Sequence, residues 1–527
     1  MKISIINNEA SVRNSIERTQ YSAAPRSACK TIQNRTVFKW GDWTAYILLT
    51  FCSLGALLLF ANHWFSSPEW KRHPIVLVIV TGFMLVTIVP ALGRWFLLPL
   101  MSRPEPLPAK AGLKVAMVTT FVPGGEPLPM LEATLSAMVA CEYPHETWVL
   151  DEGDDPDVIQ LCEKLGVHHF TRKHNPDHLT QSGSFQSFSK YGNYNAWLHH
   201  IGFERYDFIT VLDPDHVPER CFLSRTLGYF ENPSIAYVQS PQAYYNQRAS
   251  LIARGSAEET YGFYSSIQMA SYRLGFPIVI GSHNTHRVKA LKAIGGFPAH
   301  DAEDLMISYL YRSHAWRGVY VPEILARGIT PVDWKGYLTQ QRRWARSVLD
   351  IKLRRFTFFP SGVSLSTRIM GLLHGLTYLH KSLVIFAGLL LLAFMLVQNT
   401  HISFSPDASS RTSLALMCGA LLAGELYRQR FYLDRKNEWG SHWRILVLHY
   451  AKWPFFVAAL IDVLWDRKVQ YTLTVKKKEA KCKRFLLIPN LIVILILAIT
   501  AAVGMGIATK PFINPVLHSL AGLLILM

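Results

Sequence analysis

The sequence predicts an α/β domain inserted between transmembrane α-helices, with about six spans plus interfacial helices. Half of the 527 residues are hydrophobic, and the longest apolar stretches lie before residue 100 and after residue 380. The region between them has short apolar runs separated by turns, which is typical of buried strands alternating with helices. The formal net charge is +17, and many cations flank the apolar stretches, where lysine and arginine mark the cytoplasmic side of a bilayer.

The start of the chain predicts a tail followed by two spans. Residues 1–39 are polar, with no apolar stretch of the signal-peptide type, and we expect them to form a cytoplasmic N-terminal tail. Residues 40–100 hold two apolar segments joined by a short basic loop. These segments, 43–64 and 74–92, are each long enough to cross a hydrocarbon core of about 30 Å as a helix.

Residues 113–350 form the predicted cytoplasmic domain. Its apolar runs predict buried parallel strands of an α/β sheet. Asp151 directly follows one such run and Asp213 follows another, and ligands of open α/β sheets bind outside the carboxyl ends of strands. The two acids are therefore predicted to lie at one rim of the sheet. The predicted strands are 115–121, 147–150, 208–212 and 235–238.

Residues 351–465 are predicted to combine interfacial helices with two spans. The ambiguous segment is 443–465, which is apolar enough to span but contains Arg444, Lys452 and Asp462. If it crossed, the lysine-rich run after it would lie outside, against the positive-inside bias, so we expect it to lie in the interface, with a crossing as the alternative. The other predictions are interfacial helices at 349–359 and 368–379, spans at 382–397 and 413–427, a basic loop at 466–484, and C-terminal spans within 485–527.

Cysteine usage and charge argue against several function classes. The seven cysteines are scattered, with no C-x-x-C pair, which fits a reducing compartment and argues against a disulfide framework or a structural zinc site. The histidines near His168 and His199 are spaced too irregularly to bind zinc. No nucleic-acid-binding motif accompanies the basic charge, so we expect no nucleic-acid partner.

Two acidic motifs have the spacing of metal-binding or catalytic carboxylates. Asp213 and Asp215 lie in an extended segment that ends in a turn, where a hard divalent cation could bridge one or both to a diphosphate. The alternative is a solvated turn. In the Glu303-Asp304 motif, Asp304 could supply a general base for a hydroxyl group, with Asp301 as the weaker candidate. The alternative is that Glu303 and Asp304 charge the first turn of a helix, where carboxylates favour the positive end of the dipole.

Residues 340–344 supply an amide, fixed cations and an indole just before the sequence becomes apolar. Arg343 could reach a diphosphate and Gln340 could hydrogen-bond a sugar. The face of Trp344 suits the apolar face of a pyranose, and its N–H adds a donor. The alternative is an ordinary amphipathic helix with a buried tryptophan.

In their order along the chain these motifs resemble those of membrane-bound processive family-2 glycosyltransferases, in particular the bacterial cellulose synthase catalytic subunit. The likeness covers roughly residues 113–480. It begins with an aspartate, Asp151, that is similar to the first aspartate of D-D-G, followed by a D-x-D. It continues with an E-D that is similar to T-E-D, with Ala302 in place of threonine, and ends with Q-x-x-R-W. The segment 190–195 is similar to K-x-G-N-x-N and 238–242 is similar to V-Q-T-P-Q. The resemblance implies a glycosyltransferase-A-type domain.

The resemblance also implies a role for each matching residue. Asp304 would be the general base of an inverting transfer, and Glu303 and Trp344 would contact the acceptor. Asp213 and Asp215 would hold Mg²⁺, with Mn²⁺ as the alternative ion. The implied donor-binding residues are Thr120, Asp151, Lys190, Asp213, Gln340 and Arg343.

Two further segments resemble parts of the same family. Thr120 and Phe121 are similar to a Thr-Tyr pair near the nucleobase. Thr474 and Lys476 match a gating loop, F-x-V-T-x-K-G, with Lys477 in place of the glycine. Such a mobile loop closes over a bound nucleotide and excludes water. The alternative for this loop is juxtamembrane basic sequence.

Taken together, the resemblance implies an enzyme of the bacterial inner membrane that polymerises glucose from UDP-glucose into a β-glucan and passes it across the bilayer. Its expected partners are the UDP-sugar donor, the growing polysaccharide and the lipid bilayer, and accessory or regulatory subunits would fit as well. A synthase that uses UDP-N-acetylglucosamine and a non-processive transferase that glycosylates a lipid are alternatives. A transport or binding protein is a further alternative, but the clear spans have few of the charges that a transport pathway needs. The sequence does not determine linkage, product length or oligomeric state.

Overall fold

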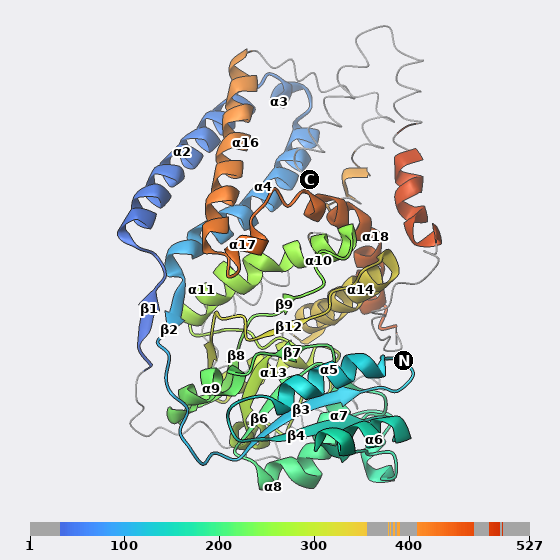
Figure 1. Cartoon of the computed structure of the whole chain (residues 1–527). Coiled ribbons are helices and arrows are strands. Elements are labelled where there is room, and N and C mark those ends of the chain that lie inside the picture. The colour runs from blue at the N-terminus through green and yellow to red at the C-terminus, as the bar shows by residue number, and fades with distance from the viewer. Residues whose placement is uncertain are drawn as a thin grey trace.

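The computed structural model describes residues 32–355, 408–467 and 484–495, together with isolated positions between 378 and 391 and at 498. An α/β domain lies below a group of long helices (Figure 1). Several predicted segments lie outside the described residues. These are the tail up to residue 31, most of 356–407 with its predicted helices and span, the loop with Thr474 and Lys476, and nearly all of the chain after residue 495.

The α/β domain is built on a seven-stranded mixed sheet with the order β11-β8-β10-β6-β3-β4-β5. Strands β6, β3, β4 and β5 pair in parallel, and β11 is parallel to β8. β10 runs antiparallel to both of its neighbours, β6 and β8. The strands are β3 (Val115–Phe121), β4 (Glu146–Asp151), β5 (His168–Phe170), β6 (Phe208–Leu212), β8 (Ile235–Gln239), β10 (Asn284–Arg287) and β11 (Arg317–Tyr320).

All four strands predicted from apolar runs are present, within one residue of the predicted bounds. The four predicted strands run in the same direction, as expected, but the sheet is mixed because β10, which the apolar pattern does not predict, is antiparallel to both of its neighbours. The sequence of β10, Asn-Thr-His-Arg, has no apolar run. Its polar side chains can be buried because they form hydrogen bonds within the protein. Thr285, for example, pairs across the sheet with Thr210, and their hydroxyl oxygens lie 2.8 Å apart.

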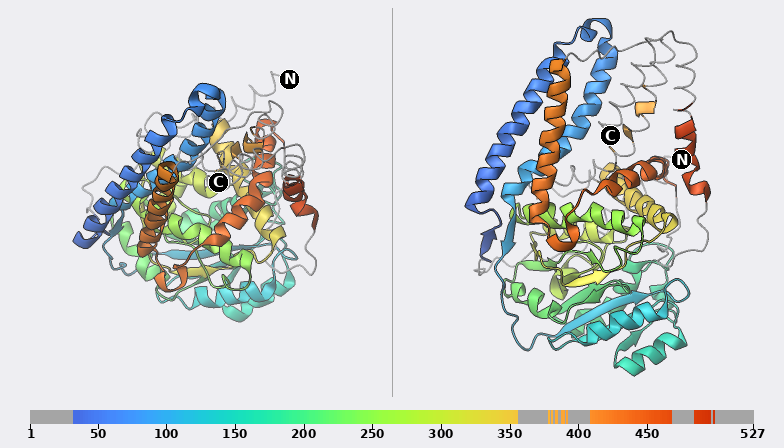
Figure 2. Two further views of the ribbon diagram at one scale, coloured as in Figure 1. Left: turned by 90° about the horizontal axis from the view of Figure 1, so that it is seen from above. Right: turned by 45° about the horizontal axis from the view of Figure 1, so that its top comes forward.

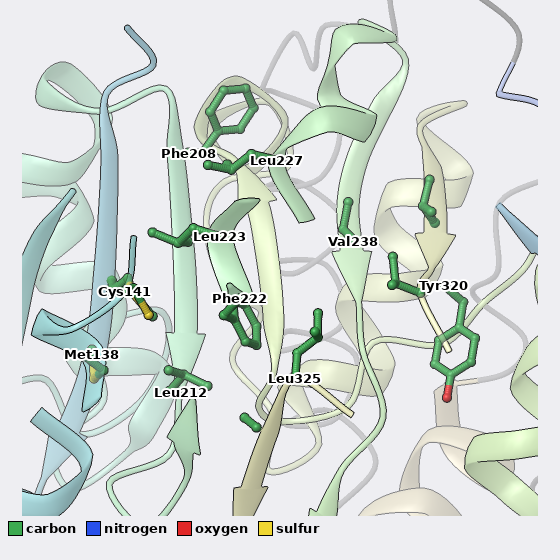
Figure 3. Packing of buried hydrophobic residues seen from close by; sticks show 14 of the residues in the cluster. Met138, Cys141, Phe208, Leu212, Phe222, Leu223, Leu227, Val238, Tyr320 and Leu325 are labelled. Atoms are coloured by element: carbon green, nitrogen blue, oxygen red, sulfur yellow. The ribbon is translucent and has the colours of Figure 1, made fainter. Parts of the chain in front are cut away.

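Helices cover both faces of the sheet. Alternate residues of each strand point to opposite faces, so Met117 of β3 packs on one face and Val118 on the other. The first face is covered by α5 (Leu128–Val139), α6 (Pro156–Leu165), α9 (Phe222–Thr226) and α11 (Gln268–Arg273), and Figure 3 shows part of this cluster, with Phe222 and Leu223 against strand residues such as Leu212. The second face is covered by α7 (Lys190–Trp197), α12 (Val288–Ala293) and α13 (Glu303–Ser313).

Two small sheets connect the domain to its surroundings. The order β7-β12-β9 places β12 beside the turn that follows β6. β1 and β2 pair antiparallel at the base of the long helices, where Arg35 Nε donates to Glu105 Oε1 at 2.6 Å. The bounds are β7 (Val217–Pro218), β9 (Ala243–Tyr244), β12 (Ala326–Gly328), β1 (Asn34–Thr36) and β2 (Ser102–Pro104).

Long helices α2 (Trp40–Phe65), α4 (Pro74–Leu97) and α16 (Ala408–Arg428) run side by side away from the α/β domain (Figures 1 and 2). The two predicted N-terminal spans coincide with α2 and α4, and the loop between them contains a short helix, α3 (Glu69–Arg72). Three described helices are long and apolar enough to cross a membrane: Trp40–Phe65, Pro74–Leu100 and Trp443–Leu464. α16 occupies the predicted span 413–427 but is not among these three.

Helix α18 (Trp443–Leu464) corresponds to the ambiguous segment. By length and composition it could cross a membrane, whereas we expected an interfacial helix. It packs against α10 (Leu251–Gly262) and α14 (Trp334–Asp350) of the α/β domain. Lys452 and Asp462, two of the charged residues that argued against a crossing, are buried in ion pairs with Glu259 and Arg342. Neither charge would therefore face lipid.

Candidate active site

The D-x-D motif follows directly on the carboxyl end of β6. The backbone N–H of Asp213 donates to Ser282 Oγ at 2.9 Å, and His216 Nδ1 lies 2.9 Å from the same oxygen. Asp215 is 2% exposed and accepts a hydrogen bond from the Ile329 N–H at 3.3 Å. The motif is thus held from two sides, by the loop before β10 and by the residue that follows β12.

The side chains of Asp213, Asp215 and His216 can share one cation. One ligand atom from each lies within 4.8 Å of the others, and no other group of three such side chains is found among the described residues. Two carboxylates suit Mg²⁺ or Mn²⁺, and the imidazole nitrogen favours Mn²⁺. The His216 ring packs against Gly328, where a Cβ would lie 1.6 Å from His216 Cδ2. Only glycine leaves room for the ring in this position.

Lys190 begins α7, and the side chain of Ser189 caps the N-terminus of this helix. Lys190 Nζ donates to Asp213 Oδ1 at 2.5 Å and to the Gly281 carbonyl at 2.6 Å, and it lies 3.9 Å from Glu303 Oε1. Burial by itself lowers the pKa of the Lys190 ammonium, but Asp213 reverses this effect, so the pKa lies well above its usual range. Lys190 is therefore a permanent cation beside the D-x-D motif, where it would attract an anionic diphosphate.

Glu303 and Asp304 occupy the first turn of α13, and both also line the cavity. Asp304 Oδ2 accepts from the Gly281 N–H at 2.7 Å, which fixes the carboxylate. The Glu303 side chain is 12% exposed. Burial raises the pKa of Glu303 to about 8, with Lys190 lowering it and Asp304 raising it. The raised pKa favours the protonated form of Glu303, which makes Asp304 the better candidate for accepting a proton.

Helix α14 presents three predicted residues to the site. Asp333 caps the helix, since its Oδ1 accepts from the Gly336 N–H at 2.8 Å. Gln340 and Trp344 are one helical turn apart, with Arg343 beside them, and all three line the same cavity. Trp344 is partly exposed there and is not buried in the core, which argues against the plain amphipathic-helix alternative.

The loop before α13 is tethered to α14 by two contacts. His300 Nε2 lies 3.0 Å from Asp350 Oδ2, and Arg346 Nη1 donates to Asp301 Oδ2 at 3.0 Å. These contacts bring the E-D motif and the Q-x-x-R-W motif together. They also engage Asp301 in an ion pair, whereas Asp304 Oδ2 accepts from the Gly281 N–H, and both carboxylates line the cavity.

One cavity of about 2640 Å³ joins these residues and continues along α4, α16 and α18. The wall of the cavity includes nine of the residues predicted from the sequence. They are Thr120, Lys190, Asp213, Asp215, Glu303, Asp304, Gln340, Arg343 and Trp344. The structure therefore brings together motifs that are spread over more than two hundred positions of the chain.

Asp151 does not line this cavity. It is fully buried, and its two carboxylate oxygens accept from the N–H groups of Gly153 at 2.8 Å and Asp155 at 2.6 Å. His169 Nε2 lies 3.2 Å from Asp151 Oδ2. Asp151 thus shapes the turn after β4, and the next residue, Glu152, lines the cavity instead.

Phe121 differs in position from what its resemblance implied. Phe121 is 2% exposed and packs in the hydrophobic cluster on the first face of the sheet, whereas Thr120 points to the cavity. His283, in the loop before β10, is fully buried behind His216, with ring centroids 4.5 Å apart, and its Nδ1 lies 2.9 Å from the Pro241 carbonyl. Burial lowers the pKa of His283 to about 3, so this ring is neutral.

Sequence reasoning missed several residues that build the site. His216 could have been found, because it directly follows the D-x-D motif. Gly281 and Ser282 act through backbone and hydroxyl groups and give no signal in a single sequence. Gly328 is needed for the space it leaves, which only the packing reveals.

Comparison with known proteins agrees with this geometry. Residues 116–347 match the family model described as glycosyltransferase like family 2. The chain is similar to the UDP-forming cellulose synthase catalytic subunit of Xanthomonas axonopodis pv. citri, with 27% identity over 57% of this chain and 40% of that protein. It is also similar to the UDP-forming cellulose synthase 1 catalytic subunit of Komagataeibacter xylinus, with 27% identity over 51% of this chain and 36% of that protein. The chain thus spans well under half the length of these two relatives.

Among solved structures, a mannosyltransferase from Pyrobaculum calidifontis in complex with GDP-Man and Mn²⁺ aligns with 81% of this chain and 99% of its own, at 16% identity and a TM-score of 0.43. The family match covers the strands, helices and cavity-lining motifs from β3 to α14. The mixed sheet with helices on both faces is accordingly a glycosyltransferase-A-like fold. Residues 116–347 form a domain of the glycosyltransferase family 2 type.

Proposed function

We propose that this chain is an inverting, processive glycosyltransferase that adds glucose from UDP-glucose to a growing β-glucan and passes the product across the bacterial inner membrane. The observation that supports this most strongly is the single cavity that contains Lys190, Asp213, Asp304 and Trp344. The likeness to UDP-forming cellulose synthases supports the choice of donor and product.

In the proposed reaction the acceptor hydroxyl oxygen attacks the anomeric carbon of the donor from the side opposite the diphosphate. The bond between that carbon and the diphosphate oxygen breaks, and the hydroxyl proton passes to Asp304. Gly281 orients this carboxylate through its N–H. Lys190 attracts the diphosphate, and Arg343 on α14 lines the same cavity. Asp213, Asp215 and His216 would hold Mg²⁺ or Mn²⁺, which when bound offsets the charge on the leaving group.

A membrane setting is supported by the surface of the long helices. α2 exposes large apolar side chains such as Leu48, Phe51 and Leu58, which would be costly in water. The cavity continues from the D-x-D motif to apolar residues of α4 and α16, including Val89 and Leu422. We propose that the α/β domain lies in the cytoplasm and that the product leaves along these helices.

The test uses membranes that contain the full-length protein, labelled UDP-glucose, and digestion of the product with linkage-specific glucanases. We expect a long labelled β-glucan, and we expect Asp304→Asn to reduce transfer by at least about a hundredfold while UDP binding stays unchanged. Full transfer by Asp304→Asn would contradict the role of this carboxylate. Incorporation of label from UDP-N-acetylglucosamine in preference to UDP-glucose would indicate that the donor is the acetylated sugar.

The apolar part of the cavity also fits a second function, glycosylation of a lipid. Val86, Val89 and Leu422 could contact an acyl or polyprenyl chain whose head group lies near Asp304. Product size distinguishes the two functions. A lipid with a single added sugar would overturn the synthase proposal and retain the transferase.

A further inference from the structure

Phe188 is an exposed aromatic residue in an unusual backbone conformation. It lies in the loop between β5 and α7, its side chain is 81% exposed, and its φ is +54°. Residues other than glycine seldom adopt this left-handed region, and a bulky side chain there is an outlier that the surroundings must enforce. Neither the exposed ring nor the left-handed conformation stabilises the folded state by itself.

A buried ion pair enforces this conformation. The Phe188 N–H donates to Glu152 Oε1 at 3.1 Å, and Glu152 accepts from Arg172 Nη2 at 2.6 Å and Nε at 3.0 Å. The Arg172 side chain is 1% exposed and also donates to the carbonyls of Phe185 and Ser189, each at 3.3 Å. The loop on both sides of Phe188 is thus fastened to the residue that follows β4.

The position of Phe188 is on the donor side of the cavity. It lines the cavity together with Thr120 at the end of β3 and Glu152 at the end of β4. Two residues later Lys190 reaches Asp213, where the diphosphate is proposed to bind. The acceptor side is instead formed by α13 and α14.

The aromatic residue that the resemblance placed near the nucleobase is not available for that role. Phe121 is 2% exposed and points into the hydrophobic cluster on the opposite face of the sheet. Phe121 therefore places no aromatic side chain in the cavity at the carboxyl ends of β3 and β4. The neighbouring loop does so with Phe188.

We propose that Phe188 is the stacking platform for the nucleobase of the donor nucleotide, an inference that rests on the proposed function. Every nucleobase has a π face, and an aromatic side chain held rigidly in place binds it without losing much conformational freedom. The ion pair of Glu152 and Arg172 positions the ring before the donor arrives.

The experiment measures binding to the full-length protein in detergent by calorimetry, with Mn²⁺ present. Two probes are used: UDP, which has a base, and inorganic pyrophosphate, which has none. We expect Phe188→Ala to weaken UDP binding by about tenfold or more and to leave pyrophosphate binding within twofold. Phe188→Trp, which keeps an aromatic ring, should bind UDP about as tightly as the unmodified protein. Phe188→Gly, which relieves the backbone, should bind UDP as weakly as Phe188→Ala.

Three results would overturn the inference, and they have different meanings. Unchanged UDP binding by Phe188→Ala would show that the ring does not stack on the base. An equal loss for UDP and pyrophosphate would show that Phe188 acts by placing Lys190. If the unmodified protein did not bind UDP at all, the proposed function itself would fail. Because Phe188 is exposed, Phe188→Ala and Phe188→Trp should unfold at the same temperature as the unmodified protein, and this is the control for folding.

Discussion

Lys190 and Asp304 are held by the backbone of one residue, Gly281. Its carbonyl accepts from Lys190 Nζ at 2.6 Å and its N–H donates to Asp304 Oδ2 at 2.7 Å. A Cβ at this position would lie 3.5 Å from the Asp304 oxygen and 3.9 Å from the Lys190 nitrogen. The candidate base and the cation of the donor site therefore keep a fixed spacing, and this preorganisation favours a single productive geometry.

The packing of Gly328 against His216 gives a test of the cation site. A Cβ on Gly328 would lie 1.6 Å from His216 Cδ2, so Gly328→Ala must displace the ring. We expect Mn²⁺ affinity to fall by about ten- to a hundredfold, measured by electron paramagnetic resonance of free Mn²⁺. Gly440→Ala is the matched control, because its Cβ would meet no atom closer than 3.8 Å. Equal Mn²⁺ affinity of the two variants would show that His216 does not bind the cation.

The raised pKa of Glu303 predicts a change near pH 8. Below that pH Glu303 is protonated in the folded protein. The stabilisation that its raised pKa gives to the folded state is present in full below the usual carboxyl pKa and is lost as the pH rises to about 8. Above it a second carboxylate appears beside Asp304 and repels an anionic donor. We expect UDP affinity to fall as pH rises through about 8 in the unmodified protein.

Glu303→Gln mimics the protonated side chain, so this variant should bind UDP with nearly constant affinity over the same range. Calorimetric titrations at several pH values check the prediction. Parallel pH profiles for the two proteins would assign the inflection to another group.

Breaking the ion pair of Arg346 and Asp301 should lower kcat without weakening the binding of UDP. Arg346→Ala releases the loop before α13 from α14, which loosens the position of Asp304. We expect kcat to fall by roughly ten- to a hundredfold, because a small misplacement of a catalytic group is costly. UDP affinity should stay within twofold.

Arg225→Ala serves as the control for Arg346→Ala. It breaks a comparable surface ion pair, with Glu323 at 2.7 Å, and neither residue lines the cavity. A similar loss of kcat in both variants would mean that the effect of Arg346 is general destabilisation.

Much of the site could be predicted because each motif is local. Asp213 stands at the end of an apolar strand, and α14 places Gln340 and Trp344 on one face by helical periodicity. Asp151 shows the limit of this reasoning. It also ends a strand and has the right chemistry, but its oxygens are used by the turn that follows, and the sequence does not show which way a terminal side chain points.

The sequence by itself determined four of the seven strands of the large sheet, the apolar helices and the order of the motifs, because periodicity and composition record burial locally. Only the tertiary structure decided that Ser282 bonds Asp213 and His216, that Phe121 is inside while Phe188 is outside, and that β10 runs antiparallel. These features depend on pairings between segments far apart in the chain. Their free energy comes from contacts that form only when the chain is folded, so no local pattern records them.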